Sequence, residues 1–266
     1  MIKKLFRGAC LLLLTALLLC SCGSGTVPEE RSGAEKLVIG SDIYEPYFYI
    51  GENGEFAGSD VEIAKEACSR LGITPVFVKI QWQNKDEYLE NGSVDCLWGC
   101  FSMNGREDMY AWVGPYAYSY QVVMVNADSD IYTLSDLYGK TIALQNSSKP
   151  EELILSGAVP GAKDVKRVYS FTTIDNAVAA LKKRYVDACA GHEAAYRTFA
   201  ERSEGDFRFL DEKLLHAKLG VAFCKDTENG ATPSALDAAL KEMISDGTVA
   251  KILESYGLSA DELPEG

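Results

Sequence analysis

The sequence predicts an α/β protein of two lobes joined by two crossings, mainly from the order of its apolar segments. Between residues 36 and 98, a strand, a helix, a second strand, a short helix and a third strand follow one another, which is typical of a parallel sheet. The same alternation restarts near residue 140 and runs to 190. A last strand and two helices bring the chain back, so we expect two similar halves with two connections. The 266 residues suffice for one large or two modest domains.

The first strand ends in a segment that indicates one wall of a small-molecule cleft. Its apolar run, Leu37–Ile39, stops at Gly40-Ser41-Asp42, which places a carboxylate at the strand tip. Four aromatic rings follow: Tyr44, Tyr47, Phe48 and Tyr49. Ligands of open α/β sheets sit beyond the carboxyl ends of the strands. Alternatively, the tyrosines only cover the sheet edge, and the sequence leaves both interpretations open.

Turn residues and apolar periodicity predict the other elements. Gly58-Ser59-Asp60 is expected to break the chain and cap a helix that Gly72 ends. Ser148 and Glu151 have the spacing of a capping box at the start of a further helix. The expected strands are 76–80, 94–98, 112–116 leading into 121–125, 140–144, 186–190 and 220–224, with a hairpin between 47–50 and 55–57; the expected helical segments are 85–91, 134–139, 148–155, 174–185, 234–244 and 248–256.

The first 35 residues are predicted to be a leader and a tether. Three basic residues precede the apolar run Ala9–Leu19, which is typical of a signal peptide over residues 1–21. Ser21-Cys22, with Leu19 three positions before the cysteine, resembles the lipobox of bacterial lipoproteins, so Cys22 is the expected site of lipidation. Residues 22–35 then form a lipid-anchored flexible tether rich in Gly, Ser, Pro and charge.

Composition excludes several classes of function. A net charge of −13 argues against a nucleic-acid partner, and two histidines are too few for a histidine-based metal site, so no metal and no cofactor are expected. The cysteines after Cys22 show no metal or redox spacing. We expect them to be buried thiols, and one internal disulfide stays open as an alternative.

Seven segments occur in an order and spacing that resemble one family. They are VIGSDIYEPY, GSDVEIA, Trp82 ahead of VDCLWGC, Arg106 ahead of WVGPY, LSDLYGKTIALQNSS, VDACAGHEAA and DGTVAKILESYG. Together they resemble the extracellular solute-binding proteins of bacterial polar amino-acid ABC importers (family 3), over about Lys36–Leu258. The resemblance implies a type II periplasmic-binding-protein-like fold with a cleft between the lobes and hinge strands near 118–122 and 214–219.

The resemblance also implies a ligand site. Tyr44 and Trp82 correspond to the rings that sandwich the ligand side chain, and Asp42 to the acid near the ligand amine. The α-carboxylate is held by Ser102, Arg106 and Ser148, and an Arg fork suits a carboxylate chemically. Locally, Arg106 could instead form a surface salt bridge and Ser148 could be only a helix cap.

One departure from the family concerns the second-lobe acid that normally takes the ligand's ammonium. At this position the chain has His192, with Glu193 beside it. Both are candidate ligand contacts. If His192 faces the amine, binding should weaken as pH falls through about 6.5, the unperturbed histidine pKa; alternatively, Asp42 or Glu193 alone serves the amine.

The expected function is that of a lipid-anchored receptor on the extracytoplasmic face of the cell membrane. It would capture an amino acid or related zwitterion by lobe closure, as a monomer, and deliver it to an ABC transporter permease. The expected divisions are 36–119 plus 219–258 for the first lobe, 120–218 for the second and 259–266 for a tail. The alternatives are a secreted dehydratase-like enzyme, for which only His192 and Glu193 offer an acid/base pair, or a ligand-sensing module. Which amino acid is bound does not follow from the sequence.

Overall fold

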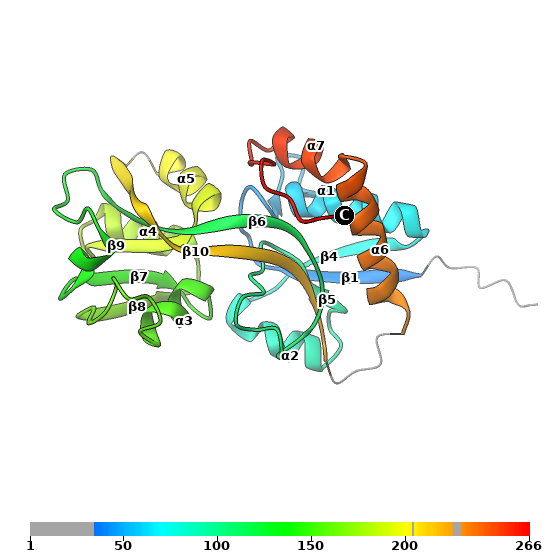
Figure 1. The fold of residues 1–266 in the computed structure, drawn as a ribbon, viewed down its shortest axis with the longest axis horizontal. Coiled ribbons are helices and arrows are strands. Elements are labelled where there is room, and N and C mark those ends of the chain that lie inside the picture. Colours follow the sequence, from blue (N-terminus) through cyan, green and yellow to red (C-terminus); the bar gives the residue numbers. More distant parts are fainter. Residues whose placement is uncertain (1–34, 204, 226–229) are drawn as a thin grey trace, which may run out of the picture. The chain divides into compact units, whose positions relative to one another are not determined.

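One mixed sheet of eight strands runs through the part of the chain that the computed structural model describes, residues 35–203, 205–225 and 230–266 (Figure 1). Its strand order is β4-β1-β5-β10-β6-β9-β7-β8. The first three strands build a first lobe, the last three build a second lobe, and β6 and β10 connect the two. The predicted two-lobed α/β fold with two crossings is therefore confirmed.

The first lobe is a parallel sheet covered by helices. β1 (Lys36–Ser41) pairs in parallel with β4 (Thr74–Lys79) on one side and with β5 (Cys96–Leu97) on the other. Asp42 follows β1 directly and so stands at the carboxyl edge of the sheet. The remaining elements of this lobe are β2 (Tyr49–Ile50), β3 (Phe56–Ala57), α1 (Ser59–Leu71), η1 (Trp82–Asn84), α2 (Lys85–Glu90), α6 (Thr232–Ser245) and α7 (Thr248–Ser255), of which α6 and α7 pack against α1.

The second lobe repeats this design. β7 (Thr141–Gln145) lies between β8 (Arg167–Phe171) and β9 (Ala188–His192) and is parallel to both. The carboxyl ends of β7 and β9 therefore lie at one edge, which carries Gln145 and His192. The helical segments here are η2 (Leu134–Leu137), α3 (Lys149–Leu155), α4 (Ile174–Lys182) and α5 (Glu193–Arg202).

Two long antiparallel strands form the connection between the lobes. β6 (Ala111–Asn126) and β10 (Phe207–Phe223) pair along most of their length, with Ser119 opposite Ala217. β10 also pairs with β5 at one end, and β6 pairs with β9 at the other. Apolar side chains of both strands belong to a buried cluster that contains residues from both lobes, so the two strands contribute to the core.

The structure corrects several predicted elements. β8 and α5 were not expected, and β10 begins at Phe207 rather than near residue 220. α4 ends at Lys182, three residues earlier than predicted, because Arg184 has a left-handed backbone conformation (φ 59°) that stops the helix. The strand predicted at 186–190 is shifted to Ala188–His192, which places the histidine at its carboxyl end.

Four of the cysteines are buried thiols. Cys68, Cys96, Cys100 and Cys189 form no disulfide, and each is almost completely shielded from solvent. Burial raises the pKa of all four thiols. For these positions the expectation of buried thiols is confirmed.

Asp60 is a buried carboxyl group that ties three segments together. Gly58 rather than Ser59 or Asp60 is the N-cap of α1, so the aspartate is free to turn inward. Its Oδ2 accepts hydrogen bonds from the Cys100 amide (2.6 Å) and the Tyr116 hydroxyl (2.8 Å). Asp60 thereby holds the loop after β5 against α1 and β6. Burial raises its pKa to about 7, although both hydrogen bonds act in the opposite direction.

This pKa shift makes the stability of the fold depend on pH. In the unfolded chain Asp60 ionises near pH 4, but in the folded protein it ionises at about 7. Its contribution to the free energy of unfolding is therefore complete below pH 4 and is lost as pH rises to 7, by up to about 1.4 kcal/mol per pH unit.

We expect Asp60→Asn to remove this titration. The difference in unfolding free energy, wild type minus variant, should fall on the order of 4 kcal/mol between about pH 4 and pH 7.5. Urea unfolding at several pH values measures it. Asp42 titrates in the same range but is present in both proteins, so its effect cancels. A difference that stays constant with pH would mean that Asp60 ionises normally in the folded protein.

Candidate functional site

A cavity between the lobes collects most of the side chains that the sequence predicted for a ligand site. The cavity is narrow, with a volume of about 30 Å³, because side chains of the two lobes lie close together around it. Seven of the eight predicted contacts line it: Asp42, Tyr44, Trp82, Ser102, Arg106, Ser148 and His192. The lining also includes residues that the sequence did not single out for this role: Gly99, Cys100, Phe101, Gln121, Gln145, Lys149 and Pro150.

Asp42 joins the first lobe to the second. Its Oδ2 accepts a hydrogen bond of 2.5 Å from Nε2 of Gln145, the last residue of β7. Burial raises the pKa of Asp42 to about 7, while the bond from Gln145 opposes the shift. Burial thus disfavours the charge on this carboxyl group, and a cationic group beside it would favour the ionised form.

Aromatic rings form part of the cavity wall. Trp82 is 7% exposed and stacks edge-on against Phe101, with ring centroids 4.8 Å apart. Tyr44 lies on the same wall, and its hydroxyl accepts a hydrogen bond from the His192 amide across the cleft. Tyr44 and Trp82 therefore line the cavity, so they do more than cover the edge of the sheet.

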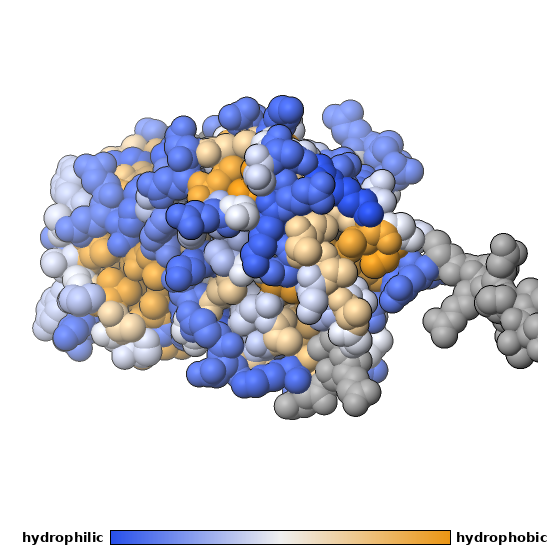
Figure 2. All heavy atoms as spheres, turned by 45° about the vertical axis from the view of Figure 1, so that its right-hand side comes forward, coloured by the Kyte–Doolittle hydropathy of each residue, from blue (hydrophilic) through white to orange (hydrophobic). Residues whose placement is uncertain are grey.

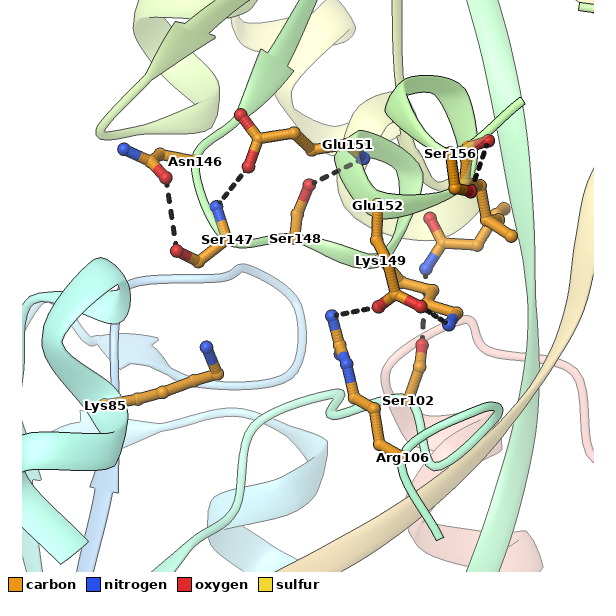
Figure 3. A network of polar contacts seen from close by, with 12 residues as sticks. Lys85, Ser102, Arg106, Asn146, Ser147, Ser148, Lys149, Glu151, Glu152 and Ser156 are labelled. Carbon is orange, nitrogen blue, oxygen red and sulfur yellow. Dashed lines mark hydrogen bonds and ion pairs between the residues drawn. The ribbon is translucent and has the colours of Figure 1, made fainter. Parts of the chain in front are cut away.

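Arg106 is buried at the cleft. Its side chain is 7% exposed, and its guanidinium lies 5.3 Å from the centroid of the Phe101 ring. Its Nη2 is 3.1 Å from Oε2 of Glu152 in the second lobe, and the other carboxylate oxygen of Glu152 contacts Lys149 (Figure 3). An arginine so enclosed is not the surface ion pair that the sequence left open.

Ser148 both caps a helix and lines the cavity. Its Oγ accepts a hydrogen bond from the Glu151 amide, as the capping-box spacing predicts. The Glu151 carboxylate, however, accepts from the amide of Ser147 rather than from that of Ser148 (Figure 3). Because Ser148 also belongs to the cavity lining, its cap role does not exclude a contact with a ligand.

His192 is the centre of a buried polar network. Gln121 lies opposite it in the pairing of β6 with β9 and donates from Nε2 to His192 Nε2 at 2.7 Å. In this arrangement the ring proton is on Nδ1, which donates to Ser119 Oγ at 3.0 Å. Ser102 Oγ is 3.3 Å from the same Nε2.

The pH behaviour predicted for His192 is corrected by this environment. Burial and the neighbouring Arg106 lower the pKa of His192 to about 3 instead of the ordinary 6.5. The imidazole therefore stays neutral throughout the physiological range, and both ring nitrogens already have partners. It can orient Gln121 and Ser102, but it does not titrate near pH 6.5.

Glu193 does not reach the cavity. It is the first residue of α5, and its carboxylate turns to Arg197, one helical turn away, and to Lys213 on β10, at 2.6 and 3.0 Å. These ion pairs hold the side chain on the hinge side of the molecule, where it lines a different pocket. Cys22, the predicted lipidation site, lies outside the described residues.

Known proteins match nearly the whole described chain. Residues 37–259 match the family model of bacterial extracellular solute-binding proteins, family 3. The glutamate-binding protein GluB of Corynebacterium glutamicum is 26% identical over 92% of this chain and 86% of its own length. The arginine-binding extracellular protein ArtP of Bacillus subtilis is 27% identical over 90% and 92%.

Solved structures agree in fold. The crystal structure of Tv2483 bound to L-arginine has a TM-score of 0.75 and 27% identity, and the match covers 83% of this chain and 90% of that one. An ancestral arginine-binding protein bound to arginine, 24% identical, has a TM-score of 0.74 over 83% and 97%. With the family model spanning both lobes and the cavity between them, this protein belongs to family 3 of the bacterial extracellular solute-binding proteins.

Proposed function

We propose that this protein is the substrate-binding component of an ABC importer and captures an amino acid or a related small zwitterion between its lobes. The observation that carries the proposal is the buried Arg106 in a small cavity lined by both lobes. Such a group suits a carboxylate, and its partner in this structure, Glu152 at 3.1 Å, is 44% exposed. Support comes from relatives named as glutamate-binding and arginine-binding proteins, one of them an ABC transporter protein of Escherichia coli.

Each predicted contact that lines the cavity has a proposed role. Arg106 binds the α-carboxylate, assisted by the hydroxyl groups of Ser102 and Ser148. Asp42 receives the amine, because an ammonium group favours the ionised form of an aspartate with a raised pKa. Tyr44 and Trp82 flank the side chain of the ligand. His192 orients its neighbours, and Glu193 is no longer among the proposed contacts, since it lies outside the cavity.

Lobe closure is the proposed motion, with bending in the paired middle of β6 and β10. The pairing of Ser119 with Ala217 supports a boundary at this point, with 36–119 plus 219–258 as the first lobe, 120–218 as the second and 259–266 as a tail. Bonds between Asp42 and Gln145, and between Tyr44 and His192, join the two lobes at the cavity.

A dehydratase-like enzyme is a weaker candidate. It requires an acid/base pair at the cavity, and the only pair that the sequence offered was His192 with Glu193. The pKa of His192 is lowered to about 3, and Glu193 is engaged by Arg197 and Lys213 away from the cavity. A receptor returns its ligand chemically unchanged, so analysis of the ligand after incubation separates the two functions.

We also propose an extracytoplasmic location, with residues 1–21 as a signal peptide, a lipid on Cys22 and 22–35 as the tether. Within the described ranges, no helix is both long and apolar enough to cross a membrane. A monomer is proposed as well. On the face drawn in Figure 2, hydrophobic residues form separate patches among hydrophilic ones, which is typical of monomer surfaces.

The principal test is a thermal-shift screen of the common amino acids, followed by calorimetry on wild type and Arg106→Ala. A ligand at a hundred times its Kd stabilises the fold by about 2.7 kcal/mol. Removing one partner of a buried charge pair costs ~3–5 kcal/mol, so Arg106→Ala should weaken binding by at least about a hundredfold.

Arg184→Ala is the matched control, because Arg184 is 64% exposed and pairs with Asp128 at the surface. It should bind as wild type does. If Arg106→Ala keeps a normal affinity while folded, or if no amino acid shifts the melting temperature of the wild type, the proposed function fails.

The lipid anchor is tested by Cys22→Ser. In a bacterial host that processes lipoproteins, the wild type should fractionate with membranes, and its mature amino terminus should carry a diacyl modification in mass spectrometry. The variant should lose both properties. A wild-type mature chain that begins well beyond Cys22 would contradict this prediction.

A further inference from the structure

Two buried basic side chains, Arg106 and Lys149, line the cavity, and a third, Lys85, stands beside Trp82 of its wall. The side chains of Lys85, Arg106 and Lys149 are 7%, 7% and 6% exposed. Lys85 opens α2 in the first lobe, and Lys149 opens α3 in the second. Buried charges are costly unless anions of comparable burial face them, so the acids around these three groups decide what the cleft can bind.

The acids that pair with these basic groups are much more exposed than the groups themselves. Glu152 contacts both Arg106 and Lys149, but its side chain is 44% exposed. Asp86 is 3.7 Å from Lys85 and 51% exposed. Asp42, at the same cavity, is buried, and burial raises its pKa to about 7. The two carboxylates that pair with the three basic groups are therefore solvated, whereas the basic groups themselves are not.

The cations lie close enough to act together. The Lys149 ammonium lies against Gly105, the neighbour of Arg106. A Cβ built on that glycine would be only 3.0 Å from Lys149 Nζ. Lys85 Nζ stands 5.5 Å from the centroid of the Trp82 ring. Burial lowers the pKa of Lys85, and Asp86, 3.7 Å away, opposes the shift. In Figure 3 Lys85 and Arg106 extend toward the same side of the turn that carries Ser147 and Ser148.

The cavity also offers acceptors for an amine. Gln121 lines the cavity. Its Oε1 is buried and has no hydrogen-bond partner within the described part of the chain. The Nε2 of the same amide is held by His192, which fixes the orientation of the group. Gln121 and Asp42 line the same cavity, and each has an oxygen that can accept a hydrogen bond from an ammonium.

We propose that the ligand carries two carboxylates and one amine, as in glutamate or aspartate. Arg106 binds the first carboxylate, and Lys149, supported by the field of Lys85 beside Trp82, selects for the second. This inference rests on the proposed function and deepens it by naming the class of amino acid. The specificity comes from Lys149 and Lys85, whereas Arg106 serves any amino acid.

The test compares acidic amino acids with their neutral amides by calorimetry at about pH 7.5. L-Glutamate and L-glutamine, and L-aspartate and L-asparagine, are pairs of nearly equal size. Hydrogen bonds to charged groups are worth ~1.5–3 kcal/mol, so the acid should bind about ten- to hundredfold more tightly than its amide in at least one pair. Glutarate and succinate, which lack the amine, should bind more weakly than the amino acids.

Single-residue variants test which side chains cause the preference for acidic amino acids over their amides. Lys149→Gln should reduce the ratio of acid to amide affinity by about tenfold or more while changing the affinity for the amide little. Lys85→Gln should reduce the ratio in the same direction by a smaller factor. Lys65→Gln, at an exposed lysine that pairs with Glu62 on α1, is the control and should leave the ratio unchanged.

The outcomes separate this inference from the proposed function. A wild type that binds a neutral or basic amino acid more tightly than glutamate and aspartate overturns the inference and leaves the proposed function intact. A preference for the acids that persists in Lys149→Gln overturns the assignment to Lys149. If no amino acid and no dicarboxylate binds, both proposals are wrong. The wild-type comparison needs no variant, so a variant that fails to fold does not prevent the decision.

Discussion

The antiparallel pairing of β6 with β10 is the constraint on which the rest of the structure depends. Its register sets which side chains of the crossing face the cleft, and the next pairing outward, of β6 with β9, brings Gln121 opposite His192. The loop that carries Ser102 is attached to the same strands, since Ser102 forms a bridge with Leu219 and the Gly220 amide donates to the Phe101 carbonyl. The floor of the cavity is therefore positioned by backbone hydrogen bonds of the two connecting strands.

The fold could be predicted from the sequence because apolar periodicity and turn residues mark most elements clearly. The exceptions have physical reasons. Two of the five residues of β8 are only partly buried and the others are exposed, so the strand lacks the apolar alternation by which strands are recognised. α5 does carry apolar residues at helical spacing, Ala195, Tyr196, Phe199 and Ala200, and that signal would have identified it.

Family resemblance pointed to seven of the residues that line the cavity, but not to its polar floor. Gln121 and Gln145 lie within strands, where a glutamine is normally interpreted as facing solvent, and only the tertiary arrangement buries them. Lys149 follows a capping serine and looked like an ordinary first-turn residue. The pKa of His192 could not be foreseen either, because desolvation depends on the neighbours that pack around the ring.

The four buried thiols also affect how the folded protein responds to oxidants. Nucleophilic attack and oxidation proceed through the thiolate, and burial that raises the thiol pKa keeps the thiolate scarce at Cys68, Cys96, Cys100 and Cys189. No crosslink joins these positions, so the packing around them holds without an oxidised bond at any of the four. Cys68, Cys96 and Cys189 are 0% exposed, so a change from reducing to oxidising conditions offers there neither a bond to break nor an accessible sulfur to modify; Cys100 differs because it lines the cavity.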